Sequence, residues 1–431
     1  MPIQRLRLSI LAILAGICWV IPPWLGGQPG NAVVFGDAQG KPATQSARRF
    51  VMDEHGLLLT TTDGSTQMRV HGYLQGDGRL FVTDLANDEH DVFLFRRVRP
   101  LVEGTVARTL AYRFMPDFGQ GMTAIQEVYA ESTGMRAAQV RAGKFKTPIG
   151  LEVMRSDRAL TFPERSLVSD LLPLRELGVQ VEGIFLREEA TYDVGFFNGT
   201  QDGQNTTFAW EGSNEAAGRA FLKPFALAKS GRLEQLGMGL AGSLGHDHNA
   251  LPGLKTVGQQ TFFKYRSSAY AQGTHERWSP QASYFHGPLG MMAEYAASDA
   301  PAREGTDRRD LRNCAWQIAG SYFLTGDPNT YGIFQPAHGF NPAHPLREHG
   351  AWEIALRHSE ARMDARAFPT YADPAKSAKD ALETGAGLSW YVNRVAKLMA
   401  FYEYTGFRAG AANVKALTPE RMAALRLQLA F

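Results

Sequence analysis

The stretch from Lys144 to Arg175 has the residue types needed to hold an anion. It carries six cations against four carboxylates. A guanidinium offers paired N–H donors that match the oxygens of a phosphate, and it does not lose its proton. Walls of low dielectric would strengthen that attraction relative to open water. A loop held by its own Arg–carboxylate ion pairs would have the same composition, so both interpretations stand. The candidate residues are Lys144, Lys146, Arg155, Arg158, Arg165 and Arg175.

A second group of cations comprises Arg96, Arg97 and Arg99. The residues around them alternate in polarity, and successive side chains of a strand point to opposite faces. Arg97 and Arg99 should therefore share a face with Glu103, and we expect these two cations to join the candidate anion site. Arg96 has the opposite parity, so we expect it to point away, toward a membrane edge.

Parity leaves one pair of cations unplaced. Arg141 and Lys144 differ in parity, so a regular strand cannot turn both to the same face. Only a bulge between them would allow it.

Other reactive residue types do not form a recognisable catalytic or metal-binding motif. His246, Asp247 and His248 are adjacent in a predicted external loop, with no further ligands to complete a metal site. His358 and Ser359 are neighbours in a predicted strand, so they project to opposite faces and cannot hydrogen-bond. We find no Ser, His and acid that would meet on one face. We therefore expect no catalytic residues, no metal and no cofactor.

The N-terminus has the layout of a secretory signal. Arg5 and Arg7 precede an uncharged stretch, Leu8 to Ile21, and small residues follow at Gly30 to Ala32. A basic region, a short apolar region and a small-x-small site are the parts of such a signal. The apolar stretch is shorter than the roughly 20 residues that a spanning helix needs. We expect residues 1–32 to be removed on export.

The composition agrees with an exported protein that does not rely on disulfides. The cysteines are Cys18 and Cys314, and Cys18 follows Ile17, where a lipoprotein signal would need a small residue. The net charge of +2 is nearly balanced and argues neither for nucleic acid nor for a strongly anion-attracting surface, so we expect no nucleic acid as a partner. After the signal there is no second long apolar run, so helical membrane spans are excluded.

Alternation of apolar and polar residues recurs along the chain, as in the segments 179–185 and 316–324. From Ala423 to Phe431 the apolar residues occupy alternate positions, with Arg426 and Gln428 on the other face. Many short segments with a period of two are typical of a transmembrane β-barrel. A last strand that ends on an aromatic residue resembles the closing strand of bacterial outer-membrane barrels, so Phe431 is the expected assembly signal.

The number of strands follows from the position of the connections. Seventeen strand-like stretches are present, but both termini should lie in the periplasm, so the number must be even. Tight connections at 287–288 and 393–394 place the stretch 261–271 in an external loop, and the Pro-rich stretch 325–350 on the periplasmic side. The sixteen predicted strands are 69–82, 92–106, 110–117, 124–133, 136–146, 177–187, 191–198, 216–225, 235–245, 274–286, 289–297, 313–324, 351–363, 384–393, 396–405 and 421–431.

Several motifs across residues 69–431 resemble the phosphate-selective porin O and P family. They include Arg96-Arg97-Val98-Arg99, Gly143-Lys144-Phe145-Lys146-Thr147-Pro148, Ser156-Asp157-Arg158, Phe162-Pro163-Glu164-Arg165-Ser166 and Arg175-Glu176-Leu177-Gly178. The resemblance implies a trimeric outer-membrane porin of 16 strands with long external loops. It also implies that one loop, residues 147–176, folds into the lumen and makes the constriction. The resemblance further implies a path like that of the family's founding members, which pass phosphate or polyphosphate along arginines, with lysines at the narrowest point.

We therefore expect an all-β transmembrane barrel at 69–431, preceded by an N-terminal periplasmic segment at 33–68. The expected function is a passive, anion-preferring channel for phosphate, pyrophosphate or polyphosphate in the bacterial outer membrane. A general or sugar-type diffusion porin with weak ion selectivity is the alternative, and an outer-membrane barrel enzyme is a more remote one. The expected partners are phosphate-like anions, outer-membrane lipid, the barrel-assembly machinery and two further copies of the chain.

Overall fold

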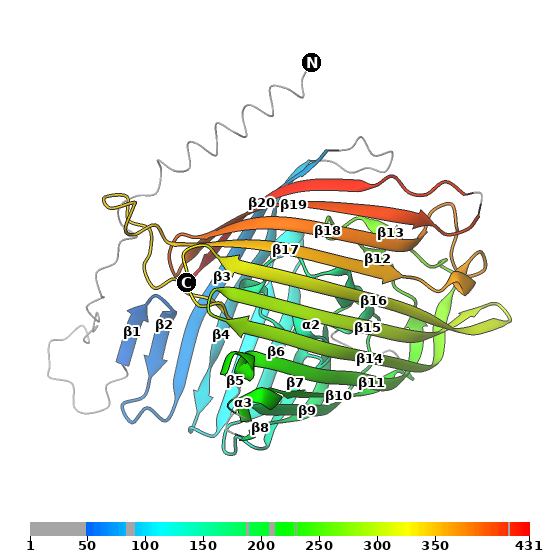
Figure 1. Cartoon of the computed structure of the whole chain (residues 1–431). Helices are drawn as coiled ribbons and strands as arrows, with labels where there is room; N and C mark the ends of the chain where they lie inside the picture. The colour runs from blue at the N-terminus through cyan, green and yellow to red at the C-terminus, as the bar shows by residue number, and fades with distance from the viewer. Residues whose placement is uncertain are drawn as a thin grey trace.

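The computed structural model describes residues 49–82, 91–186, 189–206, 212–227, 229, 231–412 and 414–431. The predicted signal, residues 1–32, lies outside this part of the chain. Within it, sixteen antiparallel strands follow one another around a barrel, which closes because β20 pairs with β3 (Figure 1). The predicted fold and number of strands are therefore confirmed. The wall strands are β3 (Gln67–Phe81), β4 (Val92–Val106), β5 (Leu110–Asp117), β6 (Ala124–Ser132), β7 (Gln139–Lys146), β8 (Arg175–Phe185), β9 (Ala190–Phe197), β10 (Asn214–Leu222), β11 (Leu236–Ala250), β14 (Tyr270–His286), β15 (Leu289–Glu304), β16 (Asp307–Phe323), β17 (Ala351–Arg362), β18 (Ala378–Tyr391), β19 (Ala396–Ala409) and β20 (Glu420–Ala430).

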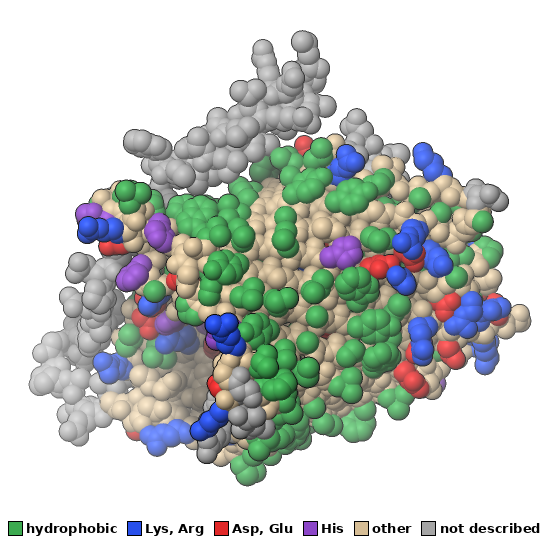
Figure 2. Space-filling model, viewed as in Figure 1, with side chains coloured by type: hydrophobic (Ala, Val, Ile, Leu, Met, Phe, Trp, Pro, Cys, Tyr) green, Lys and Arg blue, Asp and Glu red, His purple; other side chains and the backbone are tan. Residues whose placement is uncertain are grey.

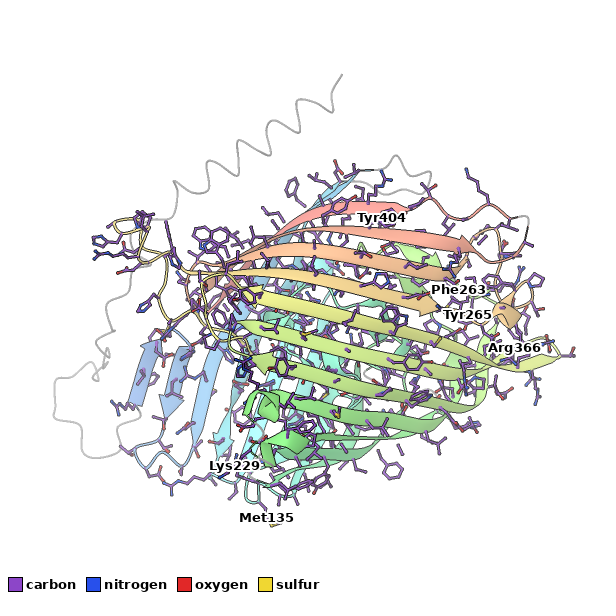
Figure 3. The ribbon with its side chains drawn as sticks, viewed as in Figure 1. Met135, Lys229, Phe263, Tyr265, Arg366 and Tyr404 are labelled. Carbon is purple, nitrogen blue, oxygen red and sulfur yellow. The ribbon has the colours of Figure 1, made fainter. Side chains whose placement is uncertain are left out.

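The period of two turns one face of each strand inward and the other outward. In β20, Arg426 is 1% exposed, whereas its neighbour Leu427 is 38% exposed. Hydrophobic side chains are spread over the outer surface, and charged side chains gather toward the two ends of the strands (Figure 2). On the outer face Trp352 and Trp390 stack with ring centroids 5.3 Å apart, and Tyr404 is exposed (Figure 3). Outward aromatic rings are typical where a barrel meets the membrane interfaces.

The connections at one end of the barrel are short except for residues 223–235, which include α3 (Pro224–Leu227) and η6 (Gly231–Gln235), and residues 324–350. Gly287, with φ +53°, makes the tight turn between β14 and β15. The long connection 324–350 lies at this same end, since Asn329 N–H donates to Gly287 O at 2.7 Å. Phe340 N–H likewise donates to Val392 O, in the turn between β18 and β19, at 2.6 Å. The Pro-rich stretch is therefore on the same side as the tight turns, as predicted.

Residues 261–269 stay out of the wall, as predicted for the stretch 261–271, but Tyr270 and Ala271 already belong to β14. In the loop between β11 and β14, β12 (Leu254–Lys255) and β13 (Thr261–Phe263) form a separate two-stranded sheet. Phe263, the last residue of β13, and the nearby Tyr265 are buried, with ring centroids 4.8 Å apart (Figure 3).

A hairpin that alternation did not predict precedes the wall. β1 (Arg49–Asp53) pairs with β2 (Gly56–Thr60), and β2 pairs with the first residues of β3. It lies within the predicted N-terminal segment 33–68, of which residues 49–68 are described. In the part of the chain that the structure describes, no helix is both long enough and apolar enough to cross a membrane.

Candidate functional site

The chain between β7 and β8, residues 147–174, runs through the inside of the barrel. It contains the short helices α2 (Leu151–Met154), η3 (Asp157–Ala159) and η4 (Leu167–Leu171). Its apolar side chains pack against alanines on the inner faces of β11 and β15–β18, whose small side chains leave room for it. The packed side chains of the segment are Ile149, Val153, Phe162, Leu167, Val168, Leu171 and Leu172.

Polar side chains of distant strands fix the backbone of this segment. Lys397 of β19 donates from Nζ to Leu160 O at 3.2 Å. Arg357 of β17 donates to Glu164 O at 2.9 Å. The carboxylate of Glu294 on β15 accepts hydrogen bonds from two backbone N–H groups at the start of α2. The segment is therefore held against the far wall by both packing and hydrogen bonds.

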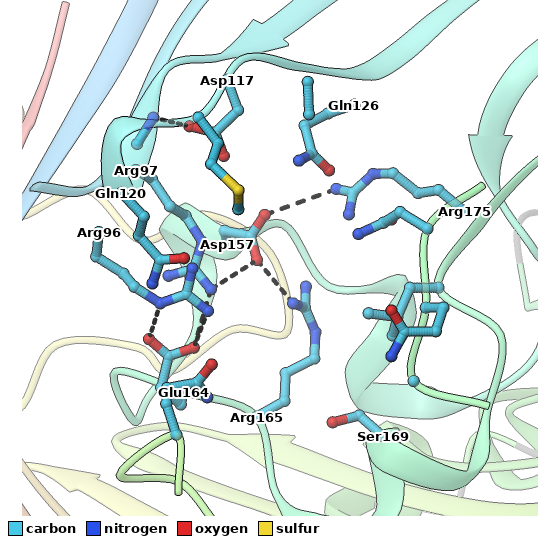
Figure 4. Close-up of a pocket in the computed structure, with 18 of the residues that line it drawn as sticks. Arg96, Arg97, Asp117, Gln120, Gln126, Asp157, Glu164, Arg165, Ser169 and Arg175 are labelled. Atoms are coloured by element: carbon cyan, nitrogen blue, oxygen red, sulfur yellow. Dashed lines mark hydrogen bonds and ion pairs between the residues drawn. The ribbon is translucent and has the colours of Figure 1, made fainter. Parts of the chain in front are cut away.

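Two cavities lie on either side of the segment. One, of about 630 Å³, is bordered by the loop residues 119–126 and 253–259. The other, of about 500 Å³, is bordered by inner residues of β3 to β8 and by Ile333 of the long connection at the opposite end. Asp157 and Arg175 line both cavities. Figure 4 shows these two residues in the larger cavity. These two residues mark the position at which one cavity gives way to the other.

Both cavities are lined by more cations than carboxylates. Among the described residues, seven cations and four carboxylates line the larger one, and five cations and three carboxylates line the smaller one. The cations of the larger cavity are Arg96, Arg97, Arg99, Lys144, Arg165, Arg175 and Lys255. Those of the smaller cavity are Arg113, Arg141, Lys146, Arg158 and Arg175. The structure thus brings seven of the eight predicted site residues to these cavities.

Asp157 is surrounded by four arginines. Its carboxylate accepts a hydrogen bond from Arg165 at 2.7 Å and forms an ion pair with Arg99. Arg97 and Arg175 each lie 3.6 Å from it. Burial by itself would raise the pKa of Asp157, but these guanidinium groups hold that pKa well below its ordinary value. The ionised carboxylate cancels part of the positive charge at the junction of the cavities.

Glu164 is the centre of a second group of four arginines. Its oxygens lie 2.7 Å from Arg96, 3.1 Å from Arg97, 2.9 Å from Arg426 and 3.2 Å from Arg79. Here too burial opposes ionisation, yet the arginines keep the pKa of Glu164 well below its ordinary value. Because Arg97 contacts both carboxylates, the two groups form one continuous cluster.

Arg96 points into the barrel, so our expectation that it faces a membrane edge is wrong. In the pairing of β3 with β4 the successive partners are Arg97 and Phe95, which leaves Arg96 as an extra residue. An extra residue of this kind is a β-bulge, and it interrupts the alternation of side chains. Arg96 therefore shares the inner face with Arg97 and binds both oxygens of Glu164, at 2.7 and 3.0 Å.

A glycine resolves the parity conflict between Arg141 and Lys144. Gly143 lies between them with φ +133°, a conformation that other residues rarely adopt. A Cβ atom there would come within 2.2 Å of Val128 O. The alternation breaks at this position, so Arg141 lines the smaller cavity and Lys144 lines the larger one.

Arg155 is the one predicted site residue that lines neither of these two cavities. Its side chain donates to Ala159 O at 2.5 Å and to Tyr331 O at 3.0 Å. Lys146 also donates to a backbone carbonyl, Met154 O, at 3.2 Å, although it lines the smaller cavity. Both side chains therefore help to fix the fold of the segment.

Sequence reasoning missed several arginines of the interior, including Arg79, Arg357 and Arg426. Arg79 on β3 and Arg426 on β20 belong to the group around Glu164. Arg357 on β17 lies 2.8 Å from Glu403 and 3.0 Å from Glu383. Each of the three occupies an inward-facing position of an alternating strand, so the alternation could have identified them.

Asp170 also lines the larger cavity, but its pKa is raised, whereas those of Asp157 and Glu164 are lowered. Its carboxylate accepts a hydrogen bond from Lys255 N–H at 2.8 Å. Burial raises the pKa of Asp170 to about 7. The charge of this cavity lining therefore changes near neutral pH.

A Ser, a His and a carboxylate meet inside the barrel, contrary to our expectation. His275 Nε2 lies 2.7 Å from Ser298 Oγ, and His275 Nδ1 lies 2.6 Å from Asp247 Oδ2. They come from β14, β15 and β11, so their meeting depends on strand register that sequence alone does not give. Ser298 is 0% exposed and also hydrogen-bonds to Asp202, so no substrate reaches its hydroxyl. Among the described residues no group of three His, Cys, Asp or Glu could hold a metal ion.

Comparison with known proteins places this chain in a family. The profile of the family "Phosphate-selective porin O and P" matches residues 69–431. Porin O of Pseudomonas aeruginosa is 23% identical over 404 residues, which cover 84% of this chain and 88% of that protein.

Solved structures of outer-membrane channels have a similar fold. The outer membrane channel DcaP of Acinetobacter baumannii gives a TM-score of 0.56 at 10% identity, over 86% of this chain and 99% of that one. An anion-selective porin from Comamonas acidovorans gives 0.54 at 11% identity, over 85% and 100%. A closed barrel with an inward segment, together with the match over residues 69–431, leads to one conclusion: the chain belongs to the phosphate-selective porin O and P family and is a porin of the bacterial outer membrane.

Proposed function

We propose that this porin is a passive, anion-preferring channel whose constriction lies where residues 147–174 separate the two cavities. The observation that carries the proposal is the excess of cations around both cavities, which meet at Arg175 and Asp157. An anion entering from either side would find N–H donors able to replace part of its hydration shell. Such sites must be weak enough for the ion to leave, and the neighbouring carboxylates serve that purpose.

The permeant ions that fit best are phosphate, pyrophosphate and polyphosphate. Guanidinium groups bind phosphate oxygens through paired hydrogen bonds, and the cluster around Asp157 and Glu164 presents several of them together. Of the predicted site residues, Arg97, Arg99, Lys144, Lys146, Arg158, Arg165 and Arg175 would contact the ion. Arg155 would act by supporting the segment.

A general diffusion porin with weak ion selectivity is the second candidate, and the same cluster favours it in one respect. Arg96, Arg97, Arg99, Arg165 and Arg175 each pair with a carboxylate of the protein. A phosphate would have to compete with Asp157 and Glu164 for these donors. The two candidates therefore differ in how strongly phosphate binds, and not in the path that it takes.

Titration of phosphate into chloride-conducting channels in planar bilayers separates the candidates. If phosphate binds at the constriction, it reduces the chloride current of the wild type, and Arg175→Gln weakens this inhibition. Arg312→Gln is the matched control, because Arg312 is 64% exposed in its side chain, on the outer face of β16. Equal chloride currents with and without phosphate would favour the general diffusion porin.

The assembly proposals have separate tests. We propose that residues 1–32 are cleaved, that Phe431 is read by the barrel-assembly machinery, and that three copies associate in outer-membrane lipid. The last proposal is supported by a solved trimer form of OmpT of Vibrio cholerae, which gives a TM-score of 0.53 at 14% identity. N-terminal sequencing of the outer-membrane form, the yield of Phe431→Ala and native mass spectrometry test the three in turn. A retained signal, an unchanged yield or a monomer would reject the corresponding proposal.

A further inference from the structure

Five buried side chains form one hydrogen-bonded group, which we call the Asp202 network. It consists of Asp202, from the connection between β9 and β10, with Asp247, His275, Arg277 and Ser298 from the wall. One oxygen of Asp202 lies 2.6 Å from Arg277 Nε, and the other lies 2.6 Å from Ser298 Oγ. Ser298 Oγ also lies 2.7 Å from His275 Nε2. All five side chains are at most 5% exposed.

The number of hydrogen atoms available decides the state of the histidine. Asp202 is bound by a guanidinium and therefore ionised, so it only accepts. The single hydroxyl hydrogen of Ser298 must then point at Asp202. At 2.7 Å, His275 Nε2 can bond to the serine oxygen only by donating its own hydrogen. His275 Nδ1 faces the carboxylate of Asp247 at 2.6 Å and donates as well when that carboxylate is ionised. With both aspartates ionised, the network is complete only when both ring nitrogens carry hydrogen.

The charges around the imidazole agree with a cationic ring. Asp247 on β11 and Asp202 of the connection contribute two carboxylates, at 2.6 and 3.8 Å from the ring nitrogens. Arg277 on β14 is the opposing cation, and it is itself paired with Glu215 on β10 at 2.9 Å. Ser298 on β15 completes the surroundings without adding charge. Three carboxylates therefore face one guanidinium and the imidazole.

Asp202 is the first residue of a segment that reaches the junction of the two cavities. Gly203 N–H donates to Leu172 O at 3.0 Å, and Leu174 N–H donates to Gln204 O at 3.0 Å. Thr206 N–H donates to Arg175 O, also at 3.0 Å. Residues 203–206 thus lie hydrogen-bonded beside the end of the inward segment, up to the backbone of Arg175. The Asp202 network therefore fixes the end of this hydrogen-bonded segment that begins at Asp202.

We infer that His275, in its doubly protonated form, is a positioning residue that holds residues 202–206 and, through their backbone hydrogen bonds, Arg175 at the constriction. Loss of the imidazole proton turns the Ser298 hydroxyl away from Asp202 and releases the segment. This role rests on the proposed function only in its last step, the effect of Arg175 on permeating anions. The state of His275 and the order of residues 198–206 are independent of that step.

Nitrogen NMR of histidine-labelled porin in lipid tests the first step. Because both ring nitrogens donate in the network, we expect both to carry hydrogen in the folded porin. His275→Gln identifies the signal by its loss. His246→Gln is the matched control, because His246 is exposed on β11 beside Asp247 and outside the network. A neutral ring at about pH 7 would overturn the inference.

Hydrogen–deuterium exchange tests the second step. In Ser298→Ala, and independently in Asp202→Asn, we expect the amides of residues 172–175 and 203–206 to exchange about tenfold faster, as expected for the loss of a buried hydrogen bond. In His275→Gln we expect the same amides to exchange faster as well. Unchanged exchange in both Ser298→Ala and Asp202→Asn would contradict the positioning role. If exchange responds as expected while the channel shows no ion preference, the proposed function is wrong, but the positioning of residues 202–206 by the Asp202 network still holds.

Discussion

Arg426 on the last strand of the barrel holds Asp77 on the first strand through two hydrogen bonds, of 2.6 and 2.7 Å. The two strands are neighbours at the closure, where β20 pairs with β3. Both side chains are buried, at 1% and 5% exposed, and the same guanidinium reaches Glu164 of the inward segment. One arginine therefore joins the closure of the barrel to the segment that narrows it.

Arg426→Gln should destabilise the barrel, because it leaves the Asp77 carboxylate buried with fewer partners. Breaking a buried ion pair from one side costs about 3–5 kcal/mol. Guanidinium unfolding in lipid vesicles measures this change. Arg408→Gln serves as the control, because Arg408 is 61% exposed in its side chain and its pair with Asp380 should contribute about 1 kcal/mol or less. Equal losses in the two variants would contradict a special role for the closure.

Neutralising Asp157 should increase the preference for anions. Asp157→Asn removes the charge that faces four arginines, while the amide oxygen can still accept hydrogen bonds. A unit charge at 4 Å contributes about 1 kcal/mol in water, which corresponds to about fivefold in anion affinity. The inhibition constant for phosphate in bilayer recordings checks this value. Asp299→Asn, on the outer face of β15, is the control and should leave that constant unchanged.

The anion preference should depend on pH near neutrality because of Asp170. Its pKa is raised to about 7, so the carboxylate is protonated below that pH and ionised above it. Lowering the pH through 7 removes one negative charge from the larger cavity, and the preference for anions should therefore rise. Asp170→Asn should show the high preference at every pH. A wild type whose selectivity is the same at pH 6 and pH 8 would contradict this assignment.

The strands could be predicted from the sequence because lipid outside and water inside impose a period of two on each of them. The same rule failed at Arg96, where a bulge breaks the alternation. It left Arg141 and Lys144 unplaced because the conformation of Gly143 cannot be read from parity. Local composition showed that the stretch from Lys144 to Arg175 is rich in cations, whereas its inward fold was an implication of the family resemblance.

The pairing of charges could not be predicted, because it depends on contacts between distant parts of the chain. Glu164 and Arg426 are 262 residues apart, and Arg357 reaches Glu164 O across 193 residues. Composition shows that arginines and carboxylates are both present, but only strand register shows which of them meet. The hydrogen-bonded group of His275, Ser298 and Asp247 was missed for the same reason.

The zero-current potential of single porin channels under a potassium chloride gradient is the most direct test of the central claim. With an excess of cations on both sides of the constriction, the potential should have the sign that chloride permeation gives. In Arg175→Gln it should move toward zero. A potential of the sign given by potassium would contradict an anion-preferring constriction built on these residues.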